Sequence, residues 1–257
     1  MPEPLILKKQ DGFYELCFFE KHGVRAVFTS RKYDMGFKRL APGNAGGRKE
    51  AYLKLGINWK RLACPLQVHG DNVFVAQEKH NGSGVFGRSG AIADTDAIVT
   101  LEAGLPLAIL TADCLPVFIL DPHNHCIALV HAGWRGVYQR LIGNTIAKMG
   151  KVCGSAPEHL LVALGPAIRQ CCYEVGKDFT EKFRPEVLKH SGGKLYFDSA
   201  DEACRQMTEL GIRRENICDS RICTSCANDE FFSFRREGQK AGRSMSVMQI
   251  NRIRDII

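Results

Sequence analysis

Apolar residues along this chain fall into short runs of the length and composition typical of β-strands. Two runs rich in aromatic and β-branched residues, 13–20 and 24–31, flank Lys21-His22-Gly23 and predict a hairpin. Residues 231–236 and 244–250 predict a second, closing hairpin. The other predicted strands cover 62–68, 72–77, 95–100, 106–111, 115–121, 126–131 and 160–165. Strands are therefore expected along the whole chain.

Helix-like spacing of apolar residues interrupts this series of strands. In residues 136–150, apolar side chains recur at near-helical intervals, as at Val137, Leu141 and Ile142. The predicted helices cover 49–56, 136–150, 175–189 and 199–210. Strands that alternate with helices predict an α/β (α+β) fold. Because no internal repeat or low-complexity linker divides the sequence, we expect one domain over residues 1–257.

Composition and charge narrow the class of protein. With 45% hydrophobic and 25% charged residues, the chain has the composition of an ordinary globular protein. Its net charge of +7 comes from scattered basic residues, a pattern that suits an anionic small molecule at least as well as a nucleic acid. No aromatic-rich RNA-binding motif accompanies them, so we expect no nucleic-acid partner.

The sequence also lacks the marks of a secreted or membrane protein. Its first residues show no signal-peptide pattern, and the apolar segment 105–120 is interrupted by Asp113 and two prolines. The eleven cysteines are an odd number in a chain without an export signal. We therefore expect free thiols, a cytoplasmic location and no membrane partner.

Three apparent motifs do not fit their context. GSGVFG at 82–87 has the letters of a dinucleotide-binding loop but lacks the strand before it and the helix after it. Cys218, Cys223 and Cys226 reproduce part of the plant-type iron–sulfur spacing, but no further cysteine follows them, so a cluster would have to be completed by a cysteine from upstream. The adjacent Cys171-Cys172 is explained more simply by burial or adventitious redox chemistry.

A stronger candidate site is formed by His69, Cys114 and His131. Each lies at the end or edge of a predicted strand, and small residues beside Cys114 and His131 allow a ligand to approach. Two imidazoles and one thiolate can hold zinc and leave its fourth position open, as a catalytic site requires. Asp113 and Asp71, which are near these residues in sequence, are candidates for orienting the ligands or accepting a proton.

Arginines supply a second half of the candidate site. Arg135 follows His131 in a glycine-flanked turn whose backbone N–H groups suit an anion. Arg235, Arg236 and Arg243 flank the last predicted turn, and guanidinium groups bind phosphate through paired hydrogen bonds. These four arginines are therefore candidate phosphate-binding residues.

Six ordered sequence blocks identify a family that the chain resembles. They are QVHG (67–70), DTDAIVT (94–100), TADCLPV (111–117), HAGWRG (131–136), LGPAIRQCCYEVG (164–176) and CTSC with FFSFRREGQKAGR (223–243). In this order they resemble the YfiH-like, laccase-domain family, whose members are described as purine nucleoside phosphorylases with adenosine deaminase activity. The resemblance implies a single domain with mixed β-sheets sandwiched between helices.

The same resemblance implies a cofactor, substrates and a ligand set. Zinc, with copper as the alternative that the family name suggests, is expected on His69, Cys114 and His131. The expected substrates are adenosine, inosine and S-methyl-5'-thioadenosine, with phosphate as co-substrate, in a monomer or homodimer. Arg31 corresponds to the arginine of the family's first motif and is a fifth candidate for binding substrate or phosphate, although TSRKYDMGF at 29–37 lacks the usual glycine pair after it.

Laccase chemistry itself is not expected. A multicopper oxidase needs many histidines in H-x-H pairs, and this chain has only His123-Asn124-His125. Phosphorolysis is the preferred hypothesis, with phosphate held by arginines and Asp113 as a candidate for moving the proton.

Two other classes of function remain open from the residues. Cys114 and His131 also match a thiol hydrolase, in which the cysteine is the nucleophile and the histidine its base. Such an enzyme would fit a cell-wall precursor peptide and peptidoglycan editing. The third class is a binding protein stabilised by structural zinc, which requires a fourth protein ligand.

Overall fold

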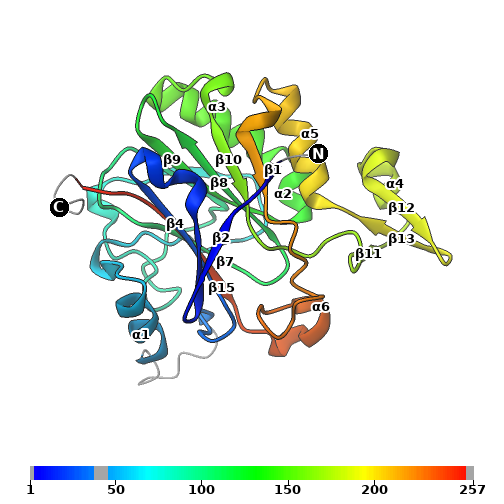
Figure 1. The fold of residues 1–257 in the computed structure, drawn as a ribbon, viewed down its shortest axis with the longest axis horizontal. Helices are drawn as coiled ribbons and strands as arrows, with labels where there is room; N and C mark the ends of the chain where they lie inside the picture. Colours follow the sequence, from blue (N-terminus) through cyan, green and yellow to red (C-terminus); the bar gives the residue numbers. More distant parts are fainter. Residues whose placement is uncertain (1–2, 38–45, 253–257) are drawn as a thin grey trace.

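The structure is a computed structural model that describes residues 3–37 and 46–252. The largest sheet in it has seven strands. Their order is β1 (Glu3–Pro4), β14 (Ile217–Asp219), β10 (Leu161–Leu164), β8 (Leu115–Asp121), β9 (Cys126–Ala132), β6 (Ala97–Thr100) and β5 (Val73–Val75). The pairings at both edges are parallel, and those from β10 through β8 and β9 to β6 are antiparallel. The sheet is therefore mixed (Figure 1).

A second sheet has five antiparallel strands. Their order is β2 (Leu7–Gln10), β3 (Phe13–Leu16), β4 (Val24–Thr29), β15 (Ser244–Ile250) and β7 (Leu107–Thr111). Strand β7 belongs to this sheet, whereas β8, which follows it directly in the chain, belongs to the seven-stranded sheet. The short connection between β7 and β8 thus crosses from one sheet to the other.

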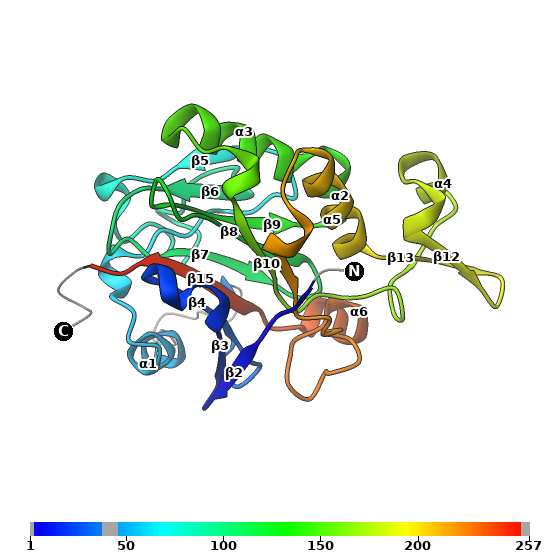
Figure 2. The same ribbon diagram turned by 45° about the horizontal axis from the view of Figure 1, so that its top comes forward.

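The two sheets pack face to face, and helices cover their outer faces (Figure 2). In β8, Val117 and Ile119 pack with α3 (Leu141–Cys153) and α5 (Ser199–Glu209), whereas Phe118 faces the five-stranded sheet. In β7, Ile109 faces β8, and Leu110 packs on the side of α1 (Gly46–Lys54). Because side chains alternate along a strand, burial on both faces explains the continuous apolar runs in the sequence. The predicted mixed α/β architecture between helices is confirmed.

A small third sheet extends from the main body beside α4 (Phe179–Lys182) (Figure 1). Its antiparallel strands are β11 (Glu174–Val175), β13 (Lys194–Phe197) and β12 (Leu188–Ser191). The other short helices are α2 (Trp134–Tyr138) and α6 (Phe234–Glu237). The 3-10 turns cover Cys17–His22, Trp59–Arg61, Glu78–His80, Pro157–His159, Pro185–Val187, Arg214–Asn216 and Gly238–Lys240.

Most predicted strands are confirmed, and three predictions are wrong in part. The first run is a strand only to Leu16 and then a 3-10 turn that ends at Gly23, whose φ of 69° suits glycine. Residues 62–68 form isolated bridges instead of a strand, and Pro65 has no N–H to donate to a ladder. The closing hairpin is absent because residues from Phe234 form a helical turn, while β15 pairs with β4 and β7.

The helix over 199–210 is confirmed, and α1 covers the predicted 49–56 region with an earlier start. The helix predicted over 136–150 is divided into α2 and α3 by Arg140, whose φ is 61°. The helix over 175–189 is largely wrong, since only α4 is α-helical there. Pro185 forces an extended conformation on Arg184 and ends the helical pattern, although Phe179, Phe183 and Val187 all reach the core.

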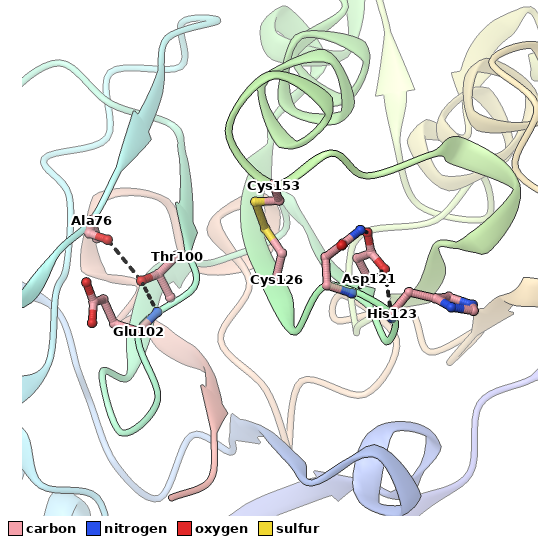
Figure 3. The surroundings of a disulfide bond; sticks show 8 residues. Ala76, Thr100, Glu102, Asp121, His123, Cys126 and Cys153 are labelled. Carbon is pink, nitrogen blue, oxygen red and sulfur yellow. Dashed lines mark hydrogen bonds between the residues drawn. A yellow bond between two sulfur atoms is a disulfide. The ribbon is translucent and has the colours of Figure 1, made fainter.

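A disulfide joins Cys126 at the start of β9 to Cys153 at the end of α3 (Figure 3). Free thiols were expected throughout, so the expectation is wrong for this pair and holds for the nine other cysteines. The two residues meet because α3 packs along the sheet that contains β9. Figure 3 also shows the adjacent turn, where Asp121 accepts a hydrogen bond from the backbone N–H of His123. Within residues 3–37 and 46–252, none of the helices is long and apolar enough to span a bilayer.

Candidate functional site

The structure brings His69, Cys114 and His131 together, as the sequence predicted. One ligand atom from each residue lies within 4.8 Å of the others. Sγ of Cys114 is 3.8 Å from Nε2 of His69, and the two imidazole rings meet edge to face with centroids 4.8 Å apart. The three side chains therefore form one cluster of a sulfur and two nitrogen donors.

Cys114 is placed by the crossing between the two sheets. It lies directly before β8, and Asp113 before it adopts a φ of 84°, which turns the chain out of β7. In the neighbouring strand β9, His131 pairs with Pro116. A Cβ on Gly133 would come within 3.0 Å of His69 and 3.3 Å of Cys114. The glycine of HAGWRG thus leaves room for the cluster.

His69 is placed by a tight turn built around Asp96. The backbone N–H groups of Val68, His69 and Gly70 all donate hydrogen bonds to its carboxylate, at 2.8–3.1 Å. These bonds support the left-handed conformation of His69, whose φ is 63°. Asp96 is fully buried at the start of β6. A buried carboxylate therefore sets the direction of one candidate ligand.

The same carboxylate also orients His131. Nδ1 of His131 donates to Oδ1 of Asp96 at 2.7 Å, which leaves Nε2 of the ring for a ligand. Burial disfavours the charged forms of His131 and Cys114, but their mutual attraction prevails. It lowers the pKa of Cys114 to about 6 and, together with the bond to Asp96, raises the pKa of His131 to about 9. The environment favours a thiolate, the form in which cysteine binds metals and acts as a nucleophile.

Asp96 is a residue of the candidate site that the sequence reasoning missed. It lies in the DTDAIVT block, but its role depends on the pairing of β6 with β9, which the pattern of apolar residues does not reveal. The predicted orienter Asp71 is exposed, and its carboxylate accepts a hydrogen bond from Asn144.

We expect Asp96→Asn to weaken metal binding at the cluster by about 10- to 100-fold, because His131 loses its charged partner. Competition with a chromophoric chelator measures the affinity. Asp71→Asn is the matched control, since Asp71 is exposed and its carboxylate accepts a hydrogen bond from Asn144. Equal affinities for the two variants would show that Asp96 does not orient the metal site.

The cluster opens into a cavity of about 590 Å³. Aromatic residues Trp134, Tyr173 and Phe234 line it, together with all three candidate ligands. Burial holds the pKa of Tyr173 above its ordinary value, so its hydroxyl stays protonated and can donate a hydrogen bond. The volume and the mixture of aromatic and polar walls are typical of a site for a small molecule.

Three of the five predicted arginines line this cavity, namely Arg135, Arg235 and Arg243. The guanidinium of Arg235 lies over Tyr173 and donates to the backbone oxygen of Glu174. That of Arg243 donates to two backbone oxygens of its own loop. Both are held in place by the protein.

Arg135 differs because its exposed side chain stacks on Trp134 and forms no hydrogen bond or ion pair with residues 3–37 or 46–252. Arg88, which the sequence reasoning missed, also lines the cavity. Its side chain is exposed and likewise forms no hydrogen bond or ion pair with residues 3–37 or 46–252. Arg31 and Arg236 are not among the residues that line the cavity. Arg31 instead forms an ion pair with Glu237.

Asp113 lines the cavity, but its carboxylate is already engaged. Oδ1 accepts a hydrogen bond from Thr224, and Oδ2 accepts bonds from the hydroxyl of Ser233 and the backbone N–H of Arg235. These bonds tie the β7–β8 crossing to the segment that carries Arg235. The arrangement favours a positioning role for Asp113.

The structure also accounts for the motifs that did not fit their sequence context. GSGVFG forms turns with no helix after it. His123 and His125 lie in the β8–β9 turn, and His123 packs against His159, away from the cavity lining. Cys171 and Cys172, which come earlier in the sequence, lie close to Cys223 and Cys226 in space. Cys218 is buried in β14 and lies outside that group.

Comparisons with known proteins identify a family and similar folds. The family described as multi-copper polyphenol oxidoreductase laccase matches residues 43–251. A purine nucleoside phosphorylase from Bacteroides thetaiotaomicron is 32% identical over 201 residues, which cover 75% of this chain and 74% of the relative. An adenosine deaminase from an unknown prokaryotic organism is 30% identical over 202 residues, covering 76% and 77%. The crystal structure of YlmD from Geobacillus stearothermophilus, at 26% identity, matches with a TM-score of 0.89 over 97% of this chain and 100% of its own.

Proposed function

The chain belongs to the multi-copper polyphenol oxidoreductase laccase family, and we propose that it is a zinc-dependent purine nucleoside phosphorylase with adenosine deaminase activity. In phosphorolysis, a phosphate oxygen forms a bond to C1′ of the nucleoside, the C1′–N9 bond breaks and the purine leaves with a proton. In deamination, oxygen from water replaces the amino group at C6 and ammonia is released. The names of two relatives support these two reactions.

One observation carries the proposal: the ligand cluster, aromatic walls and uncommitted guanidinium groups share a single cavity. Trp134 and Tyr173 offer ring faces or edges to a purine. Arg135 and Arg88 offer paired N–H donors to phosphate without first breaking bonds to the described protein. The substrates that satisfy all three features are a nucleoside and phosphate, in the form of adenosine, inosine or S-methyl-5'-thioadenosine.

The donor set of the cluster fits zinc. Imidazole nitrogen and thiolate sulfur are the ligands that zinc prefers, and Asp96 supplies the buried carboxylate that such histidines usually require. Only three His, Cys, Asp or Glu ligands group here among the described residues, which is the number found in catalytic zinc sites. Zinc bound by His69, Cys114 and His131 would supply Lewis-acid chemistry.

The residues of the chain then have distinct roles. Asp96 orients His131 and the turn that carries His69. Arg135 and Arg88 hold phosphate together with Arg235, which also lines the cavity. Tyr173 and Trp134 hold the purine. Binding both substrates against fixed walls aligns phosphate with C1′ and excludes water, which is how positioning contributes to the rate.

We expect Arg135→Gln to raise KM for phosphate by about tenfold, corresponding to the loss of one charge-assisted hydrogen bond of about 1.4 kcal/mol. KM for inosine should change little, because Arg135 is proposed to contact phosphate. Arg236→Gln is the matched control, since Arg236 is exposed and does not line the cavity. Equal effects of the two substitutions would remove Arg135 from the phosphate site.

Incubation of the zinc-loaded protein with inosine and phosphate tests the function. We expect phosphate-dependent release of hypoxanthine and ribose 1-phosphate, and release of ammonia from adenosine without phosphate. The same assays after metal removal serve as the control. If no purine nucleoside loses its base in the presence of phosphate, the phosphorylase proposal fails.

A thiol hydrolase is the second candidate. It is favoured because Cys114 lies near His131, whose ring is in turn hydrogen-bonded to Asp96. A nucleophile, a base and a carboxylate that orients the base form the usual arrangement of such enzymes. The presence of His69 favours metal binding, because a hydrolase needs one imidazole beside its thiolate and here two converge. Activity that survives chelation but is lost on thiol alkylation would favour the hydrolase, with a cell-wall precursor peptide as its substrate class.

A further inference from the structure

A second group of metal-binding side chains lies outside the cavity. It consists of Cys171, Cys172, Cys223 and Cys226, whose sulfur atoms all lie within 4.8 Å of one another. Sγ of Cys226 is 3.6 Å from that of Cys171 and 3.4 Å from that of Cys172. One pair comes from the segment after β10 and the other from the segment after β14. We call these four residues the tetracysteine group.

The sulfur spacing suits a single ion at the centre of the group. A disulfide would bring two sulfurs to about 2.0 Å, well below the separations found here. Four thiolates at about 2.3 Å from a tetrahedral ion lie about 3.8 Å from one another. The separations of Cys226 from Cys171 and Cys172, 3.6 and 3.4 Å, are close to that value, and all four sulfurs lie within 4.8 Å of one another. An iron–sulfur cluster places several iron and sulfide atoms between its thiolates, and a group this compact has no room for them.

The backbone holds the two pairs of cysteines together. Ala167, before the first pair, forms a parallel bridge with Cys223. Its N–H donates to the oxygen of Ile222, and its oxygen accepts a bond from the N–H of Thr224. Cys172 is fixed in turn by a bond from its N–H to the oxygen of Arg169. The group is therefore assembled by main-chain contacts.

The group is partly open to solvent. Cys171 and Cys226 are exposed, whereas Cys223 is buried. An ion from solvent can therefore reach the group, and the thiolate form of each cysteine would bind it.

We propose that the tetracysteine group binds one Zn²⁺ as a closed tetrathiolate site. Tetrahedral coordination by four sulfurs is characteristic of zinc, and four protein ligands leave no open position for substrate. Each thiol that is still protonated releases its proton to solvent as its sulfur binds the ion. The site is structural, and it is independent of the proposed function of the cavity.

An ion in the tetracysteine group would stabilise residues next to the cavity. Tyr173, which lines the cavity, directly follows Cys172. Thr224 lies between Cys223 and Cys226 in sequence and donates its hydroxyl hydrogen bond to Asp113. An ion in the tetracysteine group would thus join two segments that form one wall of the cavity.

Zinc content and cobalt spectroscopy test the proposal. Protein purified under reducing conditions should lose one equivalent of zinc on Cys226→Ser and none on Cys17→Ser, a half-buried cysteine outside both groups. Cobalt loaded into Cys114→Ala should retain strong thiolate-to-cobalt charge-transfer absorbance, because all four of its sulfur ligands remain. This second measurement also decides the question if Cys226→Ser does not fold.

Three results would overturn the tetrathiolate site. They are unchanged zinc content in Cys226→Ser, the absence of charge-transfer absorbance from cobalt-loaded Cys114→Ala, and disulfides within the tetracysteine group of freshly reduced protein. The result is independent of any nucleoside assay, because neither readout uses catalysis. An inactive protein that retains the four-thiolate spectrum would therefore support this proposal and count against the proposed function.

Discussion

Cys114→Ala is expected to remove the metal from the His69, Cys114 and His131 site and to lower kcat/KM for inosine phosphorolysis by about a thousandfold. The loss corresponds to about 4 kcal/mol of transition-state stabilisation, the scale on which a bound metal acts in catalysis. Two neutral imidazoles without the thiolate neither balance the charge of zinc nor complete its ligand set. Metal analysis and steady-state kinetics on the same preparation measure both effects.

The control for this substitution is Cys17→Ser, which changes a thiol outside both groups and should leave metal content and kinetics unchanged. Folding is expected to persist in Cys114→Ala, because the thiol contributes little apolar surface and alanine removes no backbone hydrogen bond. A variant that keeps one zinc at the site and full activity would exclude Cys114 as a ligand. Activity lost with zinc retained would instead favour a nucleophilic cysteine.

The sequence predicted the parts of the site that depend on local order. The apolar runs at 106–111, 115–121 and 126–131 are long and uniformly buried, so their strands and the positions of Cys114 and His131 followed directly. His69 was added by its sequence context and by the resemblance to the family. All three residues converge because β8 pairs with β9 and β6 pairs with β9 in turn.

The parts that could not be predicted depend on contacts between distant segments. Asp96 belongs to the candidate site only because the turn at 68–70 folds over it, and no local pattern indicates that contact. The tetracysteine group brings together two distant segments, since Cys172 and Cys226 are 54 residues apart in the sequence. The spacing of cysteines around Cys226 alone therefore could not indicate its partners.

The helix predicted over 175–189 was largely wrong because its apolar residues have helical spacing but reach the core from a different backbone conformation. Phe179, Phe183 and Val187 recur every four residues and all reach the core, as they would on a helix. The chain achieves this with a single α-helical turn, a proline-led 3-10 turn and a strand. Pro185 was the local signal against a continuous helix, since a proline in a helix interior removes a hydrogen bond and displaces the preceding residue.

The two proposed metal sites are connected through Asp113. Asp113 directly precedes the candidate ligand Cys114, and its carboxylate binds Thr224 between two cysteines of the tetracysteine group. Cys114 and Asp113 therefore have different proposed roles although they are neighbours in sequence. The thiol of Cys114 faces the ligand cluster, whereas the carboxylate of Asp113 fixes the segment that carries Arg235.

Asp113→Asn is therefore expected to destabilise the protein by about 3 kcal/mol, because the uncharged amide weakens bonds from Thr224 and Ser233 and faces the N–H of Arg235 with a second donor. Asparagine tolerates the positive φ at this position better than alanine, so the substitution tests the carboxylate and not the backbone. For a chain of this size the melting temperature should fall by roughly 6–12 °C. Asp229→Asn, an exposed change in the same segment as Thr224, should alter stability by less than about 0.5 kcal/mol.

Kinetics separate this positioning role from proton transfer by Asp113. If the carboxylate positions Arg235, phosphate KM should rise with the loss of stability, and kcat should fall only modestly when both substrates are saturating. A proton-transferring carboxylate predicts instead that kcat falls by at least about a hundredfold with both substrates saturating. The two kinetic constants therefore distinguish the roles, and thermal unfolding of the same preparation checks that the bonds from Thr224, Ser233 and Arg235 have been weakened.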